Sequence, residues 1–206
     1  AQDVGAETLQ EYVDKYKLNK SVDVNGIQTA AGSFSFPEDN NVFLAWAGIG
    51  QYEDLINPCS YLRFVGAIAG GGSAAEPYLM QRVRKGDDIT YEAETKLTSA
   101  MIQPETAGTL TKLMRNDVQT IYGDWQFGGL SVCAKSGTAE VGGDQTPNAM
   151  FAGFVQDDAL FAVFVLDASC PLAFVVFVEN GGAGSTVAAP VAAKVLGVCA
   201  QVLQSE

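Results

Sequence analysis

The sequence predicts an α+β fold, in which an antiparallel sheet of about four strands carries helices on both faces. Two observations lead to this class. Four segments show the helical spacing of apolar residues, and a stretch rich in aromatic and β-branched residues lies before the last of them. That stretch repeats itself, since FAGFV, FAVFV and FVVFV occupy 151–155, 161–165 and 174–178. Such runs, separated by turn-forming residues, are typical of antiparallel strands.

The first two helices are predicted by spacing and by end signals. Apolar side chains at positions i, i+3, i+4 and i+7 of residues 9–16 indicate a short helix that ends near Lys17. Asn57 precedes Pro58, which combines a capping side chain with a proline at the first helical position. The glycines at 70–72 are expected to end this second helix.

The other two helices begin at prolines. Pro104 opens a helix whose apolar residues share one face as far as Met114. Pro190 opens the last helix, which runs to about Leu203. The near-continuous hydrophobicity of the strands between them indicates a sheet that is covered on both faces.

Composition limits the function classes. A chain of 206 residues with 48% hydrophobic content is long enough for one sizeable core, so a single domain is expected. Twelve basic and 24 acidic residues give a net charge of −12, which would repel phosphate backbones, and no nucleic-acid partner is expected. The longest apolar runs, 159–166 and 172–178, are less than half of the roughly 20 residues that span a bilayer. No membrane contact is predicted within this chain.

The absence of histidine removes several kinds of chemistry. Without it, Ser-His-Asp and Cys-His machinery and the commonest metal ligand are excluded. The cysteines form no C-x-x-C pair, and neither a metal nor a cofactor is predicted. Buried thiols are the default expectation, although four cysteines would allow three disulfide connectivities in an oxidising compartment. They are Cys59, Cys133, Cys170 and Cys199.

The stretch KSGTAE at 135–140 directly follows an apolar run. A lysine after a strand is most often a solvated strand end, so this motif gains weight only from its context. Three further segments stand in order around it, AGIGQYEDLINPCSYLRFVGAIAGGGSAAEPYLMQRV at 47–83, PNAMFAGFV at 147–155 and PLAFVVFVENGGAGSTVAAPVA at 171–192. Together the four segments resemble the penicillin-binding D,D-transpeptidases and the related serine β-lactamases.

The resemblance implies a partial penicillin-binding transpeptidase fold and a set of site residues. The triad would lie on an edge strand along which the substrate peptide docks as an added strand. Lys135 would be catalytic, supplying positive charge and a hydrogen bond near a reacting serine. The hydroxyls of Ser136 and Thr138 would hold the substrate carboxylate, and the Thr138 N–H would form half of an oxyanion hole. Gly137 would keep the approach of the peptide clear.

The same resemblance implies the partners and the location. The expected ligand is a peptidoglycan stem peptide or a β-lactam. The expected location is the extracytoplasmic face of a bacterial cell membrane, with a parent protein anchored in that membrane.

The sequence departs from the family pattern in its nucleophile. The family uses S-x-x-K and S-x-N motifs, and no serine here has lysine three residues later or asparagine two residues later. The nearest imitation begins at Ser60 and places Arg63 where a lysine is needed, and arginine cannot act as a base. The expectation is therefore that 1–206 is the C-terminal part of a transpeptidase domain, starting just after the S-x-N loop.

Three functions stay open at this point. The first is a segment of a D,D-transpeptidase that performs acyl transfer in peptidoglycan cross-linking and is inactive as this isolated chain. The second is a non-catalytic homologue that binds peptidoglycan or a β-lactam, and the third is a structural scaffold with a vestigial cleft.

The motif spacing also yields structural expectations. Residues 130–141 are expected to form an edge strand antiparallel to 149–156, with Lys135 facing a groove. A strand at 160–166, which the family pattern lacks, is expected to cover an open sheet edge. The stretch RKGDDIT is expected to form a hairpin turn at Asp87 and Asp88. Cys133 shares the strand parity of Lys135, so either it faces the cleft or it is a small buried hydrophobe.

Overall fold

The computed structural model describes residues 1–156 and 172–205 of the chain. It consists of two compact units, one made of Ala1–Phe64 and Ser73–Met101, the other of Val65–Gly72 and Ile102–Glu206. The boundary therefore falls inside the helix Pro58–Ala69. The single domain over 1–206 stays a prediction.

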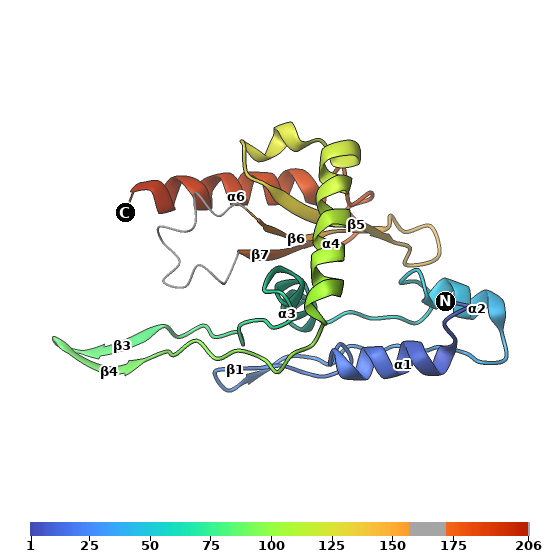
Figure 1. Cartoon of the computed structure of the whole chain (residues 1–206), viewed down its shortest axis with the longest axis horizontal. Coiled ribbons are helices and arrows are strands. Elements are labelled where there is room, and N and C mark those ends of the chain that lie inside the picture. Colours follow the sequence, from blue (N-terminus) through green and yellow to red (C-terminus); the bar gives the residue numbers. More distant parts are fainter. Residues whose placement is uncertain (157–171, 206) are drawn as a thin grey trace. The chain divides into compact units, whose positions relative to one another are not determined.

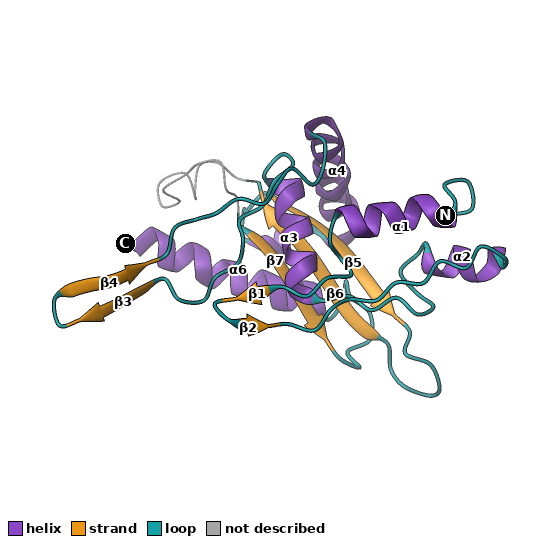
Figure 2. Ribbon diagram, turned by 90° about the horizontal axis from the view of Figure 1, so that it is seen from below, coloured by secondary structure: helices purple, strands orange, loops and turns teal. Residues whose placement is uncertain are grey.

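The first unit contains short helices and two small antiparallel hairpins. Strands β1 and β2 pair with each other, and so do β3 and β4. The β3–β4 hairpin is a long ribbon (Figure 2). Its expected turn is confirmed, because Lys85 pairs with Asp88 and leaves Gly86 and Asp87 as the two central residues. The elements are α1 (Ala6–Lys15), β1 (Asp23–Val24), β2 (Ile27–Gln28), α2 (Asn41–Ala47), the start of α3 (Pro58–Ala69), β3 (Arg82–Lys85) and β4 (Asp88–Glu92).

The start of α3 confirms the predicted cap. Asn57 Oδ1 accepts hydrogen bonds from the backbone N–H of Cys59 at 2.8 Å and of Ser60 at 3.3 Å. These contacts satisfy amides that have no partner inside the helix. The Asn57 amide group also donates to Thr29 Oγ1 at 2.6 Å, so the cap ties the helix to a distant loop.

Helix α2 was not predicted from the sequence. It is seven residues long, too short for a clear apolar periodicity. Its only local signal is Asn40, whose Oδ1 accepts from the N–H groups of Val42 and Phe43, both at 3.1 Å. A capping asparagine without a periodic face behind it is a weak signal.

The second unit contains a three-stranded sheet with the order β5-β6-β7 (Figure 2). All pairs are antiparallel, as expected. The expected strand at 160–166 lies outside the described residues. The elements are the end of α3, α4 (Pro104–Asp117), a π-helical turn (Val118–Tyr122), a 3-10 turn (Asp124–Phe127), β5 (Val132–Ala139), β6 (Asn148–Val155), β7 (Ala173–Val178) and α6 (Ala188–Ser205).

The core of this unit lies between the sheet and α6. Figure 1 shows α6 running across β6 and β7, and its small residues pack against the sheet together with Leu196. Phe151 of β6 is fully buried at the centre, stacked between Phe127 at 6.1 Å and Phe174 at 5.9 Å. Phe154, on the opposite face of β6, is 1% exposed, so both faces of this strand are covered as predicted.

Cys59, Cys133 and Cys199 are free thiols, and Cys170 lies outside the described residues. Cys133 is completely buried, which favours the buried alternative over the cleft. Within residues 1–156 and 172–205, no helix combines the length and the hydrophobicity that crossing a membrane requires.

Candidate active site

The K-S-G-T residues lie on β5, which is an edge strand of the sheet formed by residues 1–156 and 172–205. β5 pairs along its whole length with β6, from Val132 opposite Val155 to Ala139 opposite Asn148. The register has no shift, so alternate residues turn their backbone groups to β6 and to the open edge. The prediction of an edge strand antiparallel to β6 is therefore confirmed.

Hydrogen bonds identify which residues face the open edge. The N–H of Ser136 donates to the phenol oxygen of Tyr122 at 3.1 Å, and the carbonyl of Val132 accepts from Arg115 Nη1 at 3.2 Å. Neither partner belongs to β6, so the even-numbered residues of β5 direct their backbone groups away from it. By the same alternation, the N–H of Thr138 points to the open edge.

Lys135 is exposed and its ammonium bends toward the same edge. Lys135 Nζ donates to the carbonyl of Ser136 at 2.9 Å and to the hydroxyl of Tyr122 at 3.3 Å. Its side chain starts on the sheet face opposite to that of Ser136, as the alternation requires. The positive charge thus lies beside the strand edge.

The hydroxyls of Ser136 and Thr138 have partners within the protein. Ser136 Oγ lies 3.1 Å from the hydroxyl of Tyr122. Thr138 Oγ1 accepts from the backbone N–H of Gly184, in the loop before α6, at 3.2 Å. Both side chains are on the sheet face that α6 covers, and their role toward a substrate carboxylate stays a prediction.

Two glycines meet where this loop crosses the strand. A Cβ on Gly184 would collide with the backbone carbonyl oxygens of Gly137 and Met150. A Cβ on Gly137 would meet the flexible end of Met150, with Cε at 3.1 Å. The tight backbone approach in this place belongs to Gly184, and the docking role of Gly137 stays a prediction.

Arg115 fastens the segment that precedes β5. Its Nη1 and Nη2 atoms donate to the two carboxylate oxygens of Asp124 at 2.6 and 2.7 Å. These hydrogen bonds hold the pKa of Asp124 below its usual value. Because Arg115 also donates to Val132, one guanidinium joins α4, the 3-10 turn and the start of β5.

Cys133 and Ser60 do not supply a nucleophile here. Burial raises the pKa of the Cys133 thiol to about 11, so the thiol is protonated at neutral pH, and it donates to Gln156 Oε1 at 3.3 Å. Ser60 is 2% exposed and donates to the carbonyl of Lys20 at 2.9 Å. Arg63, three residues later, pairs with Glu76 at 2.9 Å.

Tyr122 and Arg115 were not identified from the sequence. Neither belongs to a motif, and each reaches β5 from an element that ends before the strand begins. The one local signal is that Tyr122 precedes a glycine, Gly123, with a positive φ of 90°. A glycine at that place marks a turn and gives no information about a hydroxyl at the strand edge.

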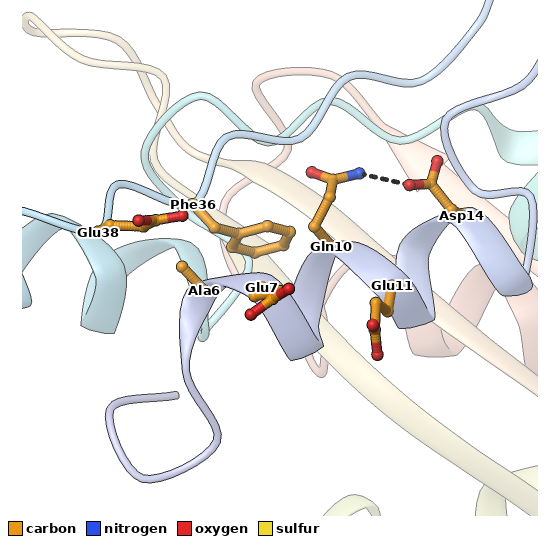
Figure 3. Close-up of a pocket in the computed structure, with 7 residues that line it drawn as sticks. All are labelled: Ala6, Glu7, Gln10, Glu11, Asp14, Phe36 and Glu38. Atoms are coloured by element: carbon orange, nitrogen blue, oxygen red, sulfur yellow. Dashed lines mark hydrogen bonds between the residues drawn. The ribbon is translucent and has the colours of Figure 1, made fainter.

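The first unit has a pocket along α1 that is lined mainly by acidic side chains (Figure 3). Its carboxylates are Glu7, Glu11, Asp14 and Glu38, and Gln10 Nε2 donates to Asp14 at 3.3 Å. It contains none of the predicted site residues. In the part of the chain that the structure describes, no group of three or more His, Cys, Asp or Glu residues is arranged to hold a metal.

Comparison with known proteins identifies relatives of this chain. A family model described as the penicillin-binding protein transpeptidase domain matches residues 1–197. The chain is 27% identical over 197 residues to the peptidoglycan D,D-transpeptidase PbpA of Mycolicibacterium smegmatis. It is 26% identical over 202 residues to PbpA of Mycobacterium tuberculosis. These alignments cover 91% and 93% of this chain but only 38% and 39% of the two relatives.

Solved structures show the same fold. A ceftriaxone acyl-enzyme complex of penicillin-binding protein A from M. tuberculosis matches with a TM-score of 0.80 and 24% identity, over 97% of this chain and 44% of that one. The D,D-transpeptidase domain of a peptidoglycan glycosyltransferase from Eggerthella lenta matches with a TM-score of 0.72 and 22% identity, over 96% and 49%. The predicted fold class is therefore confirmed.

Proposed function

The chain belongs to the family of penicillin-binding protein transpeptidase domains, and from this premise we propose that it supplies the substrate-binding edge strand of a peptidoglycan D,D-transpeptidase. The observation that carries the proposal is the position of the K-S-G-T motif on the open edge of β5. Relatives named peptidoglycan D,D-transpeptidase PbpA support the reaction class. The reaction is acyl transfer in peptidoglycan cross-linking.

The edge of β5 suits a peptide that docks as an added strand. Its even-numbered residues direct N–H and carbonyl groups away from β6, as on a strand to which an incoming backbone can add, and Val132 and Ser136 already have partners within the protein. The N–H of Thr138 faces the same way, so it is placed to donate to an oxygen that becomes negative during acyl transfer. Losing one such donor typically lowers the rate on the order of 100-fold or more.

Lys135 gives the edge its positive charge. Its ammonium is exposed and bends toward the backbone of Ser136 at the open side of the strand. The chain as a whole has a net charge of −12, so a local cation is needed to attract a carboxylate. The proposed ligands, a stem peptide and a β-lactam, both carry a carboxylate, and Ser136 and Thr138 are the proposed hydroxyl contacts.

The proposed location is the extracytoplasmic face of the bacterial cell membrane, because the proposed substrate, peptidoglycan, is built outside that membrane.

Within the 206 residues no serine has a lysine three positions later, so the nucleophile and its base are not supplied by an S-x-x-K motif of this chain. We therefore assign Lys135 a catalytic role only together with a nucleophilic serine that no S-x-x-K motif of these 206 residues supplies.

Labelling with a fluorescent penicillin tests this function. The natural protein that carries this sequence is expected to be acylated, and Lys135→Ala is expected to slow acylation by at least 100-fold. Lys112→Ala, on α4, is a matched control that removes one positive charge outside the site. Acylation that is equally fast in both variants would contradict the proposal.

The 206-residue chain provides a second arm. Intact-mass analysis after incubation with penicillin is expected to show no adduct, because the sequence gives no serine a lysine three residues later to take its proton. If the natural protein also stays unlabelled but still binds penicillin reversibly, the non-catalytic binding homologue is the correct interpretation. A stoichiometric adduct on the chain that is lost in Ser136→Ala would overturn the role of Ser136 as a binding residue.

A further inference from the structure

The hydroxyl of Tyr122 holds the edge of β5 at the motif residues from outside the sheet. Its oxygen lies within hydrogen-bond distance of Lys135 Nζ, of Ser136 N and of Ser136 Oγ, at 3.3, 3.1 and 3.1 Å. Tyr122 thus contacts the cation, the backbone and the side chain of two adjacent motif residues.

The three contacts use the whole hydrogen-bonding capacity of the Tyr122 hydroxyl. A phenol oxygen has two lone pairs and one proton. The Lys135 ammonium and the Ser136 amide can only donate, so together they use both lone pairs. The phenol proton is left for the bridge to the Ser136 hydroxyl, which can donate or accept. One tyrosine therefore satisfies three polar groups of the strand.

The ring of Tyr122 is fixed by its surroundings. Its edge packs against the face of Phe151, with centroids 5.3 Å apart and planes at 83°. Its carbonyl accepts from Gln126 Nε2 at 2.6 Å. The residue ends a π-helical turn, a local irregularity that is frequent at functional sites. The hydroxyl is therefore directed at the strand by both the core and the backbone.

The contact has a consequence for a peptide that adds to β5. An added strand hydrogen-bonds to alternate residues, which on this edge are the even-numbered ones. At Ser136 the N–H is taken by Tyr122 and the carbonyl by Lys135 Nζ. At Val132 the carbonyl is taken by Arg115. An incoming backbone could therefore pair at Ser136 only by displacing Tyr122 and Lys135, which marks Ser136 as an end of the edge that such a backbone uses.

We propose that Tyr122 is a positioning residue that holds Lys135 at the strand edge and sets, at Ser136, the end of the segment to which a substrate peptide pairs. The inference rests on the proposed function of β5. It adds a residue that lies in no sequence motif of this chain and that acts through Lys135 and Ser136.

The variant Tyr122→Phe removes the hydroxyl and keeps the ring on Phe151. Hydrogen exchange of single backbone amides in the 206-residue chain is the first measurement. The Ser136 amide is expected to exchange about tenfold faster, the effect of one hydrogen bond. The Gly137 amide, which faces β6, is expected to stay unchanged. Tyr91→Phe, in the β3–β4 hairpin, is the matched control.

Acylation of the natural protein by a fluorescent penicillin is the second measurement. Tyr122→Phe is expected to lower the maximal acylation rate about tenfold while the final labelled fraction stays complete, because Lys135 is still present but less well held. A purely structural role would instead reduce the labelled fraction and leave the rate of the remaining molecules unchanged.

The two measurements separate the possible failures. An unchanged Ser136 amide, or a uniform rise across all β5 amides, would overturn the inference. An unchanged acylation rate would overturn it as well. If the wild type is not acylated, the proposed function fails, and the exchange of Ser136 relative to Gly137 still decides whether Tyr122 holds the strand.

Discussion

Strand β5 and the β3–β4 hairpin both present β structure at the surface, but they use it differently. Every residue of the hairpin strands is exposed, and its hydrogen bonds run between its own strands, as from Arg82 to Glu92. On β5, by contrast, Tyr122 and Arg115 reach the strand edge from preceding elements, and the sheet face behind is buried. β5 differs from the hairpin because side chains from separate elements converge on its edge.

The hairpin shows how an exposed edge is managed without a site. Charged residues are frequent along it, among them Arg82, Arg84 and Lys85. Such side chains discourage pairing with other chains. Its aromatic and aliphatic residues are exposed as well, for example Val83 at 38% and Tyr91 at 41%. Matched substitutions in the sheet that contains β5 and in the β3–β4 hairpin test this difference.

The largest difference in stability between the sheet and the hairpin is expected when an aromatic residue in each is replaced by alanine. Phe151→Ala removes a fully buried ring from the middle of the sheet and should lower the free energy of unfolding by about 4 kcal/mol. Tyr91→Ala in the hairpin should cost about 0.5 kcal/mol, because its ring is already hydrated. Urea unfolding of both variants measures this. Equal losses would mean that the hairpin contributes as much to stability as the sheet.

The second effect concerns the loop that crosses β5. Gly184→Ala places a Cβ against the carbonyls of Gly137 and Met150 and should cost about 3 kcal/mol. Gly197→Ala, in α6, is the control, since among the described residues no atom beyond the helix's own backbone lies within 4 Å of the Cβ that alanine would add. Alanine also favours a helix by about 1 kcal/mol over glycine. Thermal unfolding should therefore shift in opposite directions. A Gly184→Ala protein as stable as the wild type would show that the loop does not pack on the strand.

The third effect compares two arginine–carboxylate pairs. Asp124→Asn breaks the two-pronged contact with Arg115 and should cost about 1 kcal/mol at pH 7, a modest value because the Asp124 side chain is 41% exposed. Glu92→Gln, in the exposed pair with Arg82, should cost at most about 0.5 kcal/mol.

The pH dependence sharpens this comparison. The pKa of Asp124 is lowered in the folded state by the hydrogen bonds from Arg115, relative to the usual 3.8. Its contribution to stability is therefore complete above that value and is lost as the pH falls through the folded-state pKa. The gap between wild type and Asp124→Asn should be constant at neutral pH and shrink in acid below about pH 4. A gap that widens on acidification would contradict the ion pair.

The sequence predicted those parts of the fold that have local causes. Asn57 before Pro58 located α3, and Pro104 located α4, because caps and prolines act within one helical turn. The K-S-G-T motif and the apolar repeats located β5, β6 and β7. Parity along β5 followed as well, since side chains in a strand alternate.

The remaining parts depend on contacts between distant residues. Tyr122 is 14 positions from Ser136, and Gly184 is 46 positions from Thr138. The spacing of residues in the sequence does not reveal that the Tyr122 hydroxyl contacts the Ser136 amide, or that Gly184 lies against the carbonyl of Gly137. These contacts appear only when the elements are packed. They are also the contacts that distinguish β5 from an ordinary edge.

The most direct test of β5 as the docking strand is a titration of the isotope-labelled 206-residue chain with penicillin, followed through backbone amide signals in NMR. The account predicts weak binding, with shifts concentrated at Ser136, Gly137 and Thr138 and with the signals of the Arg82–Glu92 hairpin unchanged. Shifts in the hairpin without shifts on β5 would contradict it.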